Sequence, residues 1–244
     1  MTINILFIFL LTIGASFIQR TVGFGFGIFI MTMLPYLMPS YGEATTLSGL
    51  LALTTSAVIA WKMRRVAEWR KLVLILATFT LVSALCICWL KRIDDRVLRE
   101  ILGVVLVLIG IYFAWMSRRI KIPTSWPYQI GAGTLSGFLG GFFGMQGPPA
   151  VLYFISASKD KEHYMALAQT YFLCGNILMT GVRAWNGFLT PAVGRGYLYG
   201  LGGAAIGTSL GAFVFRHIPN RIFRYIVYAY ICLAGVIIFV TSVS

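Results

Sequence analysis

Ten apolar segments divide the chain, and the short loops between them hold most of its charged residues. The segments comprise residues 4–19, 21–38, 43–61, 72–90, 97–116, 128–142, 144–157, 163–182, 196–215 and 222–242. A membrane-spanning helix needs about 20 apolar residues. Only 11% of this chain is charged, against about 25% in a soluble domain. The pattern therefore predicts an all-α polytopic membrane protein and argues against a soluble enzyme, a secreted disulfide scaffold or a disordered regulator.

The net formal charge of +13 comes from 20 Lys and Arg residues against 7 Asp and Glu residues. The basic residues form short clusters between apolar segments, a distribution that sets orientation in a membrane and attracts anionic lipid headgroups. We therefore expect these basic residues to interact with membrane lipids and not with nucleic acid. No basic region precedes the first apolar segment, which argues against a cleavable signal peptide. Four cysteines without a CxxC spacing are expected to be buried free thiols: Cys86, Cys88, Cys174 and Cys232.

An internal repeat relates the two halves of the chain. A shift of 119 residues places several pairs in register: Gly14 with Gly133, Phe24-Gly25 with Phe143-Gly144, Glu43 with Glu162, and Arg64 with Arg183. We therefore interpret residues 1–120 and 121–244 as two five-segment transmembrane repeats that together form one transport domain.

The odd number of segments gives the two repeats opposite orientations if every segment crosses the membrane. In that arrangement 14 Lys and Arg residues lie on one side and 6 on the other, a bias that the positive-inside rule predicts. If the first two segments of each repeat instead form one broken span, the two repeats are parallel. The two sides of the membrane then carry 10 and 9 Lys and Arg residues, and Arg20 is buried. We favour the inverted 5+5 arrangement with both termini outside, although segments 4–19 and 128–142 are short enough to re-enter.

Two glycine-rich stretches occupy equivalent places in the repeats. They are Gln19-Arg20-Thr21-Val22-Gly23-Phe24-Gly25-Phe26-Gly27 and the run from Gly137 through Gly144-Met145-Gln146-Gly147 to Pro148-Pro149. Irregular backbone within a membrane lines a cavity or is buried in protein. A half-helix that starts after such a break offers free N–H groups to an anion, and packing between helices is the alternative use of the glycines. We predict broken helices at both places and a substrate site that includes Gly23, Gly25, Gly27, Gly144 and Gly147.

Polar residues near the breaks extend this predicted site. Arg20, with Gln19 and Thr21 beside it, either supplies positive potential to an anion path or lies in a cytoplasmic turn at the headgroups. An arginine near the bilayer centre costs at least ~2.5–3.5 kcal/mol and therefore needs a partner or a function. Gln146 follows the second break. Four residues share one face of segment 163–182, for substrate binding or for hydrogen bonds between helices: Gln169, Asn176, Thr180 and Arg183.

All seven acidic residues lie at segment ends or in loops. Cation pumps and exchangers place carboxylates inside the membrane, so this distribution favours an anionic substrate. Glu43 and Glu162 begin equivalent segments, where they either stabilise helix N-termini or take part in proton coupling. The sequence contains no hydrolase, nucleotide-binding or metal-site motif. We therefore expect no enzyme activity, no cofactor and no bound metal.

The same residues resemble the TauE/SafE sulfite exporter family, also called the toluene-sulfonate uptake permeases. The resemblance rests on four motifs: Gly23-Phe24-Gly25-Phe26-Gly27 with Leu34-Pro35, Gly137 to Gly144 with Gly147-Pro148-Pro149, Asn176, and Arg221-Ile222-Phe223-Arg224. Met145-Gln146 departs from the small residue expected there. The resemblance implies transport of sulfite, sulfoacetate, other organosulfonates or related small anions.

The combined prediction is a multi-pass secondary transporter of the bacterial inner membrane that exports or takes up a small sulfur-containing oxyanion. It would work by alternating access, coupled to protons or to the membrane potential, with the anion held at half-helix N-termini near the midplane. An anion channel and a non-transport scaffold subunit are the alternatives. The anion, the direction of transport and the oligomeric state stay open, with a homodimer among the options.

Overall fold

The computed structural model describes residues 2–116, 123–219 and 222, and over these residues it consists of helices without strands. The helices are α1 (Thr2–Val22), α2 (Phe26–Ile30), α3 (Leu34–Leu37), α4 (Tyr41–Met63), the short 3-10 helix η1 (Trp69–Lys71), α5 (Val73–Leu90), α6 (Asp95–Met116), α7 (Trp126–Phe143), α8 (Gly147–Ala157), α9 (Lys161–Trp185) and α10 (Pro191–His217). The predicted all-α fold is confirmed. Except for Ile222, the predicted segment 222–242 and the Arg221 to Arg224 motif lie outside the described residues.

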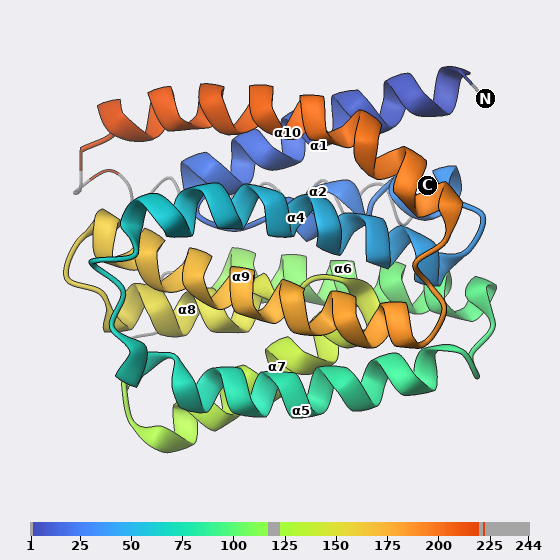
Figure 1. Ribbon diagram of the computed structural model, residues 1–244. Helices are drawn as coiled ribbons and strands as arrows, with labels where there is room; N and C mark the ends of the chain where they lie inside the picture. Colours follow the sequence, from blue (N-terminus) through green and yellow to red (C-terminus); the bar gives the residue numbers. More distant parts are fainter. Residues whose placement is uncertain (1, 117–122, 220–221, 223–244) are drawn as a thin grey trace.

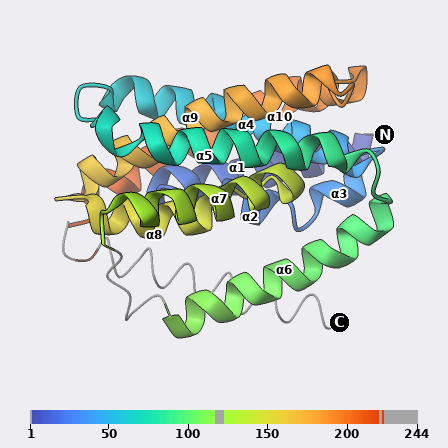
Figure 2. The same ribbon diagram turned by 90° about the horizontal axis from the view of Figure 1, so that it is seen from below.

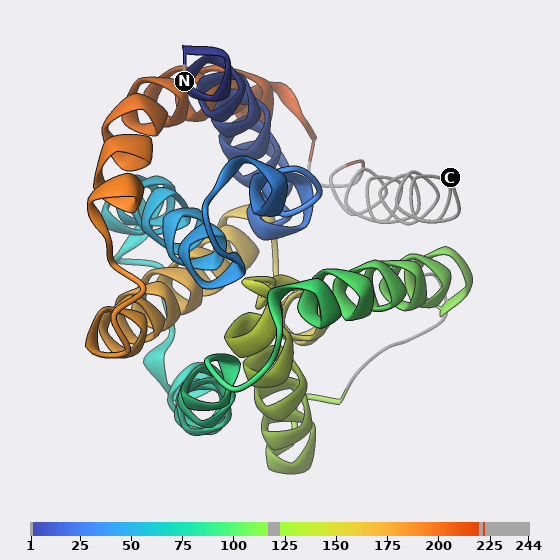
Figure 3. The same ribbon diagram turned by 90° about the vertical axis from the view of Figure 1, so that its right-hand side faces the viewer.

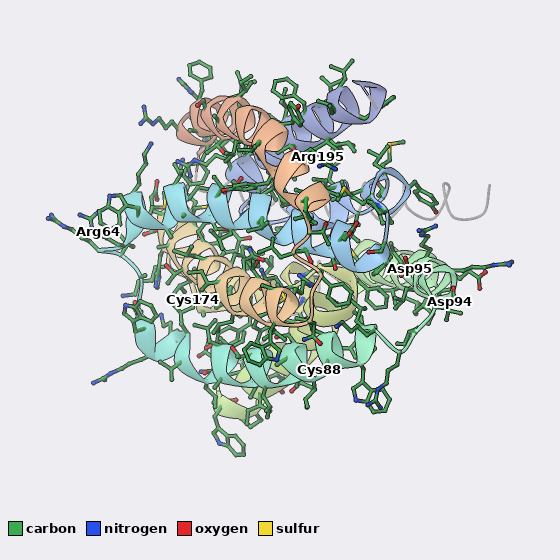
Figure 4. The ribbon with its side chains drawn as sticks, turned by 45° about the vertical axis from the view of Figure 1, so that its right-hand side comes forward. Arg64, Cys88, Asp94, Asp95, Cys174 and Arg195 are labelled. Carbon is green, nitrogen blue, oxygen red and sulfur yellow. The ribbon has the colours of Figure 1, made fainter. Side chains whose placement is uncertain are left out.

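Among the described residues, five helices are long and apolar enough to cross a membrane: α1 over Ile5–Val22, α4, α5, α9 and α10. The 23 residues of α4 extend about 35 Å, more than the ~30 Å of a hydrocarbon core. Large apolar side chains such as Leu81, Trp89 and Phe213 are exposed, as lipid-facing residues are. Charged residues lie at opposite ends of the bundle, with Arg64 at one end and Asp94 and Asp95 at the other (Figure 4). The chain is therefore a multi-pass membrane protein.

Side-chain caps explain where the long helices begin. Ser40 Oγ accepts the Glu43 N–H at 3.2 Å ahead of α4, and Asp160 Oδ1 accepts the His163 N–H at 2.7 Å ahead of α9. Each cap satisfies one N–H that has no partner inside the helix. Glu43 and Glu162 lie in the first turns of these helices, where a carboxylate is stabilising.

Both predicted glycine breaks are present. The chain leaves α1 through Gly23 and Gly25, whose φ angles are 95° and 102°, and leaves α7 through Gly144, whose φ is 69°. Residues with a side chain rarely adopt these left-handed conformations, which explains why glycine stands at the breaks. The equivalence of the breaks as repeat positions stays a prediction.

The predicted membrane-spanning segments that follow the breaks are interrupted or too short, so this part of the prediction is wrong. Segment 21–38 contains two short helices, α2 and α3, and not one membrane-length helix. The second segment, 144–157, contains α8, whose 11 residues extend only about 16 Å. Neither α2, α3 nor α8 is long enough to cross a bilayer as a continuous helix.

The long helices form layers. The α1–α10 pair lies on one side, α4 and α9 lie in the middle, and the α5–α7 pair lies on the other side (Figures 1 and 3). These three helix pairs have the most extensive packing in the described structure. Helix α6 runs along an edge of the bundle (Figure 2), and Arg99 on α6 stacks 5.7 Å from the ring of Tyr36 on α3. Both outer pairs combine a helix from residues 1–120 with one from residues 121–244.

Matched helices of the two halves run in opposite directions. The colour gradient of Figure 1 shows α4 and α9 antiparallel across the middle of the bundle, and α1 antiparallel to α7. Opposite directions are what inverted repeats require, whereas two parallel copies would give the same direction. The inverted 5+5 division itself stays a prediction, because the last predicted segment lies outside the described residues.

Glycine stripes bring the outer helix pairs close together. On α10, added Cβ atoms at Gly203, Gly207 and Gly211 would meet the carbonyl oxygens of α1 residues. On α7, added Cβ atoms at Gly133 and Gly137 would lie 2.7 Å and 2.9 Å from α5 carbonyl oxygens. Small residues at such spacing allow helix backbones to approach in membranes. The close approach of the helices in these pairs therefore depends on glycine.

Candidate functional site

A small cavity of about 30 Å³ lies where the two breaks meet. It is lined by Gln19, Phe24, Gly25, Phe26, Gly27, Ile28, Ala52, Gly144, Met145, Gln146, Gly147, Phe172 and Asn176. A water molecule needs about 10–15 Å³ by this measure, so the cavity has room for about two. The first break supplies one wall, the second break supplies the opposite wall, and α4 and α9 contribute Ala52, Phe172 and Asn176.

The two breaks touch each other through their backbones. A Cβ atom at Gly27 would overlap the backbone oxygen of Gly144, and a Cβ atom at Gly147 would lie 3.3 Å from the ring of Phe24. Glycine is therefore required by close approach at position 27, whereas a methyl group at position 147 would be a tight contact with Phe24.

The half-helices offer unequal numbers of N–H donors. In α2 the first intrahelical bond runs from Phe29 N to Gly25 O at 2.9 Å, so the N–H groups of residues 26–28 precede the helical hydrogen-bond pattern. In α8, Pro148 and Pro149 have no N–H, and Ala150 N donates to Ser136 Oγ at 3.1 Å. The start of α8 therefore leaves only the Gly147 N–H. Most backbone donors come from the first break, whereas the sequence predicted a contribution from both.

A chain of buried amides fixes the first break. Gln19 Nε2 donates to Ser56 Oγ at 2.8 Å and to Gln169 Oε1 at 2.9 Å, and Gln169 Nε2 donates to the Gly23 carbonyl at 2.7 Å. Gln169 does not line the cavity. Its described contacts connect α9 with the irregular backbone at Gly23, so it positions the break.

A second amide pair faces the cavity. Gln146 Nε2 donates to Asn176 Oδ1 at 2.9 Å. Both side chains are buried, and Gln146 Oε1 and Asn176 Nδ2 have no hydrogen-bond partner. A buried polar group without a partner is costly. The pair therefore presents one unused acceptor and one unused donor group at the cavity.

Arg20 lies outside the cavity lining. It is 7% exposed, its Cζ lies 5.0 Å from the ring centre of Phe215 on α10, and its Nη1 has no hydrogen-bond partner. Arg20 therefore neither lines the cavity nor is exposed on the surface of the described structure, and both readings of its role stay predictions. Thr21 is also buried outside the lining, and its hydroxyl has no partner.

The structure brings together seven of the eleven predicted substrate residues: Gln19, Gly25, Gly27, Gly144, Gln146, Gly147 and Asn176. The other four, Arg20, Thr21, Gly23 and Gln169, lie outside the cavity lining. The two coupling candidates also lie outside it. Glu43 is half-buried with an unpartnered Oε2, whereas Glu162 is exposed.

Sequence reasoning missed the apolar part of the lining and one buried cation. Phe24, Phe26 and Phe172 line the cavity beside its polar groups. Arg183 is completely buried and donates from Nη1 to Thr45 O at 3.2 Å and from Nη2 to Gly140 O at 2.9 Å and Gly141 O at 3.2 Å. Its place on the polar face of segment 163–182 was a usable signal. The positive-inside count had placed it in an outer loop.

The cysteines and acidic residues give no sign of a metal centre. Cys86 is a buried free thiol, whereas Cys88 is exposed and Cys174 half-buried, which corrects the expectation that all are buried. Cys232 lies outside the described residues. No three His, Cys, Asp or Glu side chains gather into a metal-binding group in the described part of the chain.

Comparison with known proteins gives one match. A family model described as "Sulfite exporter TauE/SafE" matches residues 8–238, nearly the whole chain. No curated protein and no solved structure matches significantly.

Proposed function

Because this chain belongs to the TauE/SafE sulfite exporter family, a family of membrane anion transporters, we propose that it carries a small sulfur-containing oxyanion such as sulfite or an organosulfonate. We place it in a bacterial inner membrane and propose that it works by alternating access. The observation that carries this proposal is the meeting of two broken helices, one from each half of the chain, at one cavity.

The chemistry of the lining suits an oxyanion. The N–H groups of residues 26–28 and Gly147 and the unpartnered Asn176 Nδ2 are donors, and an oxyanion presents several acceptor oxygens. No Asp, Glu, Lys or Arg lines the cavity. Neutral donors hold an anion without the strong attraction of a buried ion pair, which suits a substrate that must also be released. The aromatic residues would contact the carbon part of an organosulfonate.

The cavity volume supports a transport cycle with a closed state. About 30 Å³ has room for about two waters, whereas sulfite has four heavy atoms. We propose that the breaks separate at the Gly27–Gly144 contact to admit the substrate. We propose that the two halves rock against each other across α4 and α9, which opens the cavity first to one side and then to the other.

Proton coupling or the membrane potential would drive this cycle. Glu43 is the stronger coupling candidate, because its Oε2 atom is buried without a hydrogen-bond partner. Glu162 is exposed at the start of α9 and is explained by helix-terminus stabilisation.

Transport assays in proteoliposomes test the proposal. We expect saturable uptake of at least one anion from a panel of [35S]sulfite, organosulfonates, sulfate and thiosulfate, and faster uptake when the same anion is loaded inside. Current that rises linearly with concentration, without this trans-stimulation, would identify an anion channel. No flux for any member of the panel would contradict transport and leave the scaffold alternative.

Gly25→Leu and Gly144→Leu test the breaks directly. A leucine cannot adopt the positive φ of either glycine without strain, so both variants should lose transport. Gly194→Leu is the matched control, because nothing lies within 4 Å of an added Cβ at Gly194. Normal transport by the two break variants would show that the breaks are not the site.

A further inference from the structure

Arg183 is a completely buried cation without a carboxylate partner among the described residues. Its described acceptors are three backbone carbonyls, of Thr45, Gly140 and Gly141, and its Nε has no hydrogen-bond partner. Carbonyl dipoles orient a guanidinium, but they do not cancel its charge. Buried charges in proteins are normally paired with an opposite charge. This cation therefore lacks a counter-charge.

Gly49 leaves a polar space beside Arg183. The position that a Cβ atom would occupy at Gly49 lies 3.4 Å from Arg183 Nη1, 3.6 Å from Thr180 Oγ1 and 4.0 Å from Asn176 Oδ1. Three polar side chains from successive turns of α9 therefore converge on Gly49, one of the two glycines of α4. Thr180 Oγ1 has no hydrogen-bond partner.

Asn176 connects this space to the cavity. Its side chain lines the cavity between the breaks, and its Nδ2 has no partner. Arg183 lies two turns farther along α9, toward the end of the bundle that holds Asp95 (Figures 1 and 4). An anion that leaves the cavity along α9 would pass from Asn176 to Thr180 and then to Arg183.

We propose that Gly49, Thr180 and Arg183 form a second subsite for the transported oxyanion, joined to the cavity by Asn176. This inference rests on the proposed function and adds to it the cation that recognises the negative charge. Arg183 would bind one oxygen through Nη1, the guanidinium nitrogen nearest Gly49, while Thr180 donates its hydroxyl proton. The carbonyls of Gly140 and Gly141 hold the guanidinium in place, so little ordering is needed when the anion arrives.

The same carbonyls belong to the last turn of α7, next to the second break. An anion at Nη1 leaves these two hydrogen bonds in place, because Nη2 makes both of them. The occupied subsite would therefore stay joined to the end of α7. Binding and movement of the second break are coupled in this way.

Gly49→Ala is the sharpest test, because it fills the polar space without removing any group. The added methyl would lie at ordinary contact distances, and alanine is the better helix former, so the variant should fold. Gly181→Ala on α9 is the matched control, since nothing lies within 4 Å of its added Cβ. We expect the KM for [35S]sulfite to rise at least tenfold in Gly49→Ala and to stay unchanged in Gly181→Ala.

Arg183→Lys and Arg183→Gln separate charge from geometry. We expect sulfite to raise the Tm of purified wild-type protein relative to equal sodium chloride, and this shift to shrink in Arg183→Lys and vanish in Arg183→Gln. If Arg183→Gln fails to fold, the loss of the sulfite-dependent Tm shift in Gly49→Ala tests the subsite instead. The subsite is wrong if a folded Gly49→Ala variant shows wild-type KM and the wild-type Tm shift.

Failure of the proposed transport function would give results that differ from those of a failed subsite proposal. Wild-type protein could transport none of the anion panel but show the sulfite-dependent Tm shift, and Gly49→Ala could lose that shift. This result would support the subsite proposal and contradict the transport proposal. If wild-type protein shows neither flux nor shift, both proposals are overturned. Transport by wild type with unchanged kinetics in Gly49→Ala overturns the subsite alone.

Discussion

Gly27 on the first half-helix and Gly144 at the end of α7 are in direct backbone contact, so that even a single methyl group at position 27 would overlap the Gly144 oxygen. The two residues come from different halves of the chain, and each lies at a glycine break. Their contact lies where the chain passes from α1 to the short helix α2 and from α7 to the short helix α8.

Gly27→Ala should separate the breaks. The obstacle is a backbone atom that cannot rotate away, so we expect a loss of about 1–3 kcal/mol in stability, as for other overpacked sites. Transport should fall at least tenfold. Denaturation in detergent and sulfite uptake measure the two effects, with Gly194→Ala as the control because its Cβ would lie in open space. Wild-type stability and uptake in Gly27→Ala would show that the contact is dispensable.

Gln169→Leu should destabilise the first break. The substitution leaves the Gly23 carbonyl without its donor and removes one acceptor from Gln19 Nε2. An unsatisfied buried group costs about 1–3 kcal/mol, so the Tm should fall clearly and transport with it. Ser209→Ala is the control, because its exposed hydroxyl bonds only within its own helix. If Gln169→Leu matches wild type in Tm and uptake, the amide chain does not position the break.

Much of the helical framework could be predicted because its signals are local. Long apolar runs predicted α4, α5 and α9, and caps at Ser40 and Asp160 define two helix starts. The glycine breaks were predictable for the same reason, since only glycine readily adopts the φ angles of Gly25 and Gly144. Each of these features depends on a few neighbouring residues.

The environments of the arginines depend on distant parts of the chain and could not be predicted. Arg20 packs on Phe215 of α10, and Arg183 binds carbonyls of α4 and α7. Neither partner has a sequence pattern that points to it. The scarcity of N–H donors at α8 was different, because Pro148 and Pro149 show in the sequence that two donors are missing.

Glu68 forms a pH-sensitive contact at the end of the bundle near Arg64. Its carboxylate lies 3.0 Å from Lys71 Nζ and 3.2 Å from His163 Nε2. The hydrogen bond from Lys71 is the main cause that lowers the pKa of Glu68. A lowered folded-state pKa gives stability that is present above the unfolded value of about 4.3 and lost as the pH falls through the folded-state value.

We therefore expect Glu68→Gln to lower the Tm at pH 7 and to match wild type once the pH lies below the folded-state pKa of Glu68. Tm measurements of both proteins from pH 3 to 7 test this. The carboxylate is exposed, so the difference at pH 7 should be small. A difference that grows as the pH falls would contradict the assignment.

The glycine stripe on α10 should matter for assembly of the fold and not for substrate choice. A side chain at Gly207 would meet the Ile13 carbonyl of α1. We expect Gly207→Val to lower the free energy of unfolding by about 1–3 kcal/mol, because it forces the helices apart. The fraction of the variant that folds should have the wild-type KM. A raised KM at normal stability would place α10 in the transport path.

Asn176→Asp tests whether the cavity binds an anion. The two side chains have nearly the same shape, but aspartate replaces the unpartnered Nδ2 donor with a negatively charged oxygen at the cavity. Because like charges repel strongly in a buried site, we expect the KM for sulfite to rise at least tenfold. Asn186→Asp makes the same change at the end of the same helix, outside the lining, and should leave KM unchanged. If Asn176→Asp instead binds the anion as tightly as wild type, the substrate does not occupy this cavity.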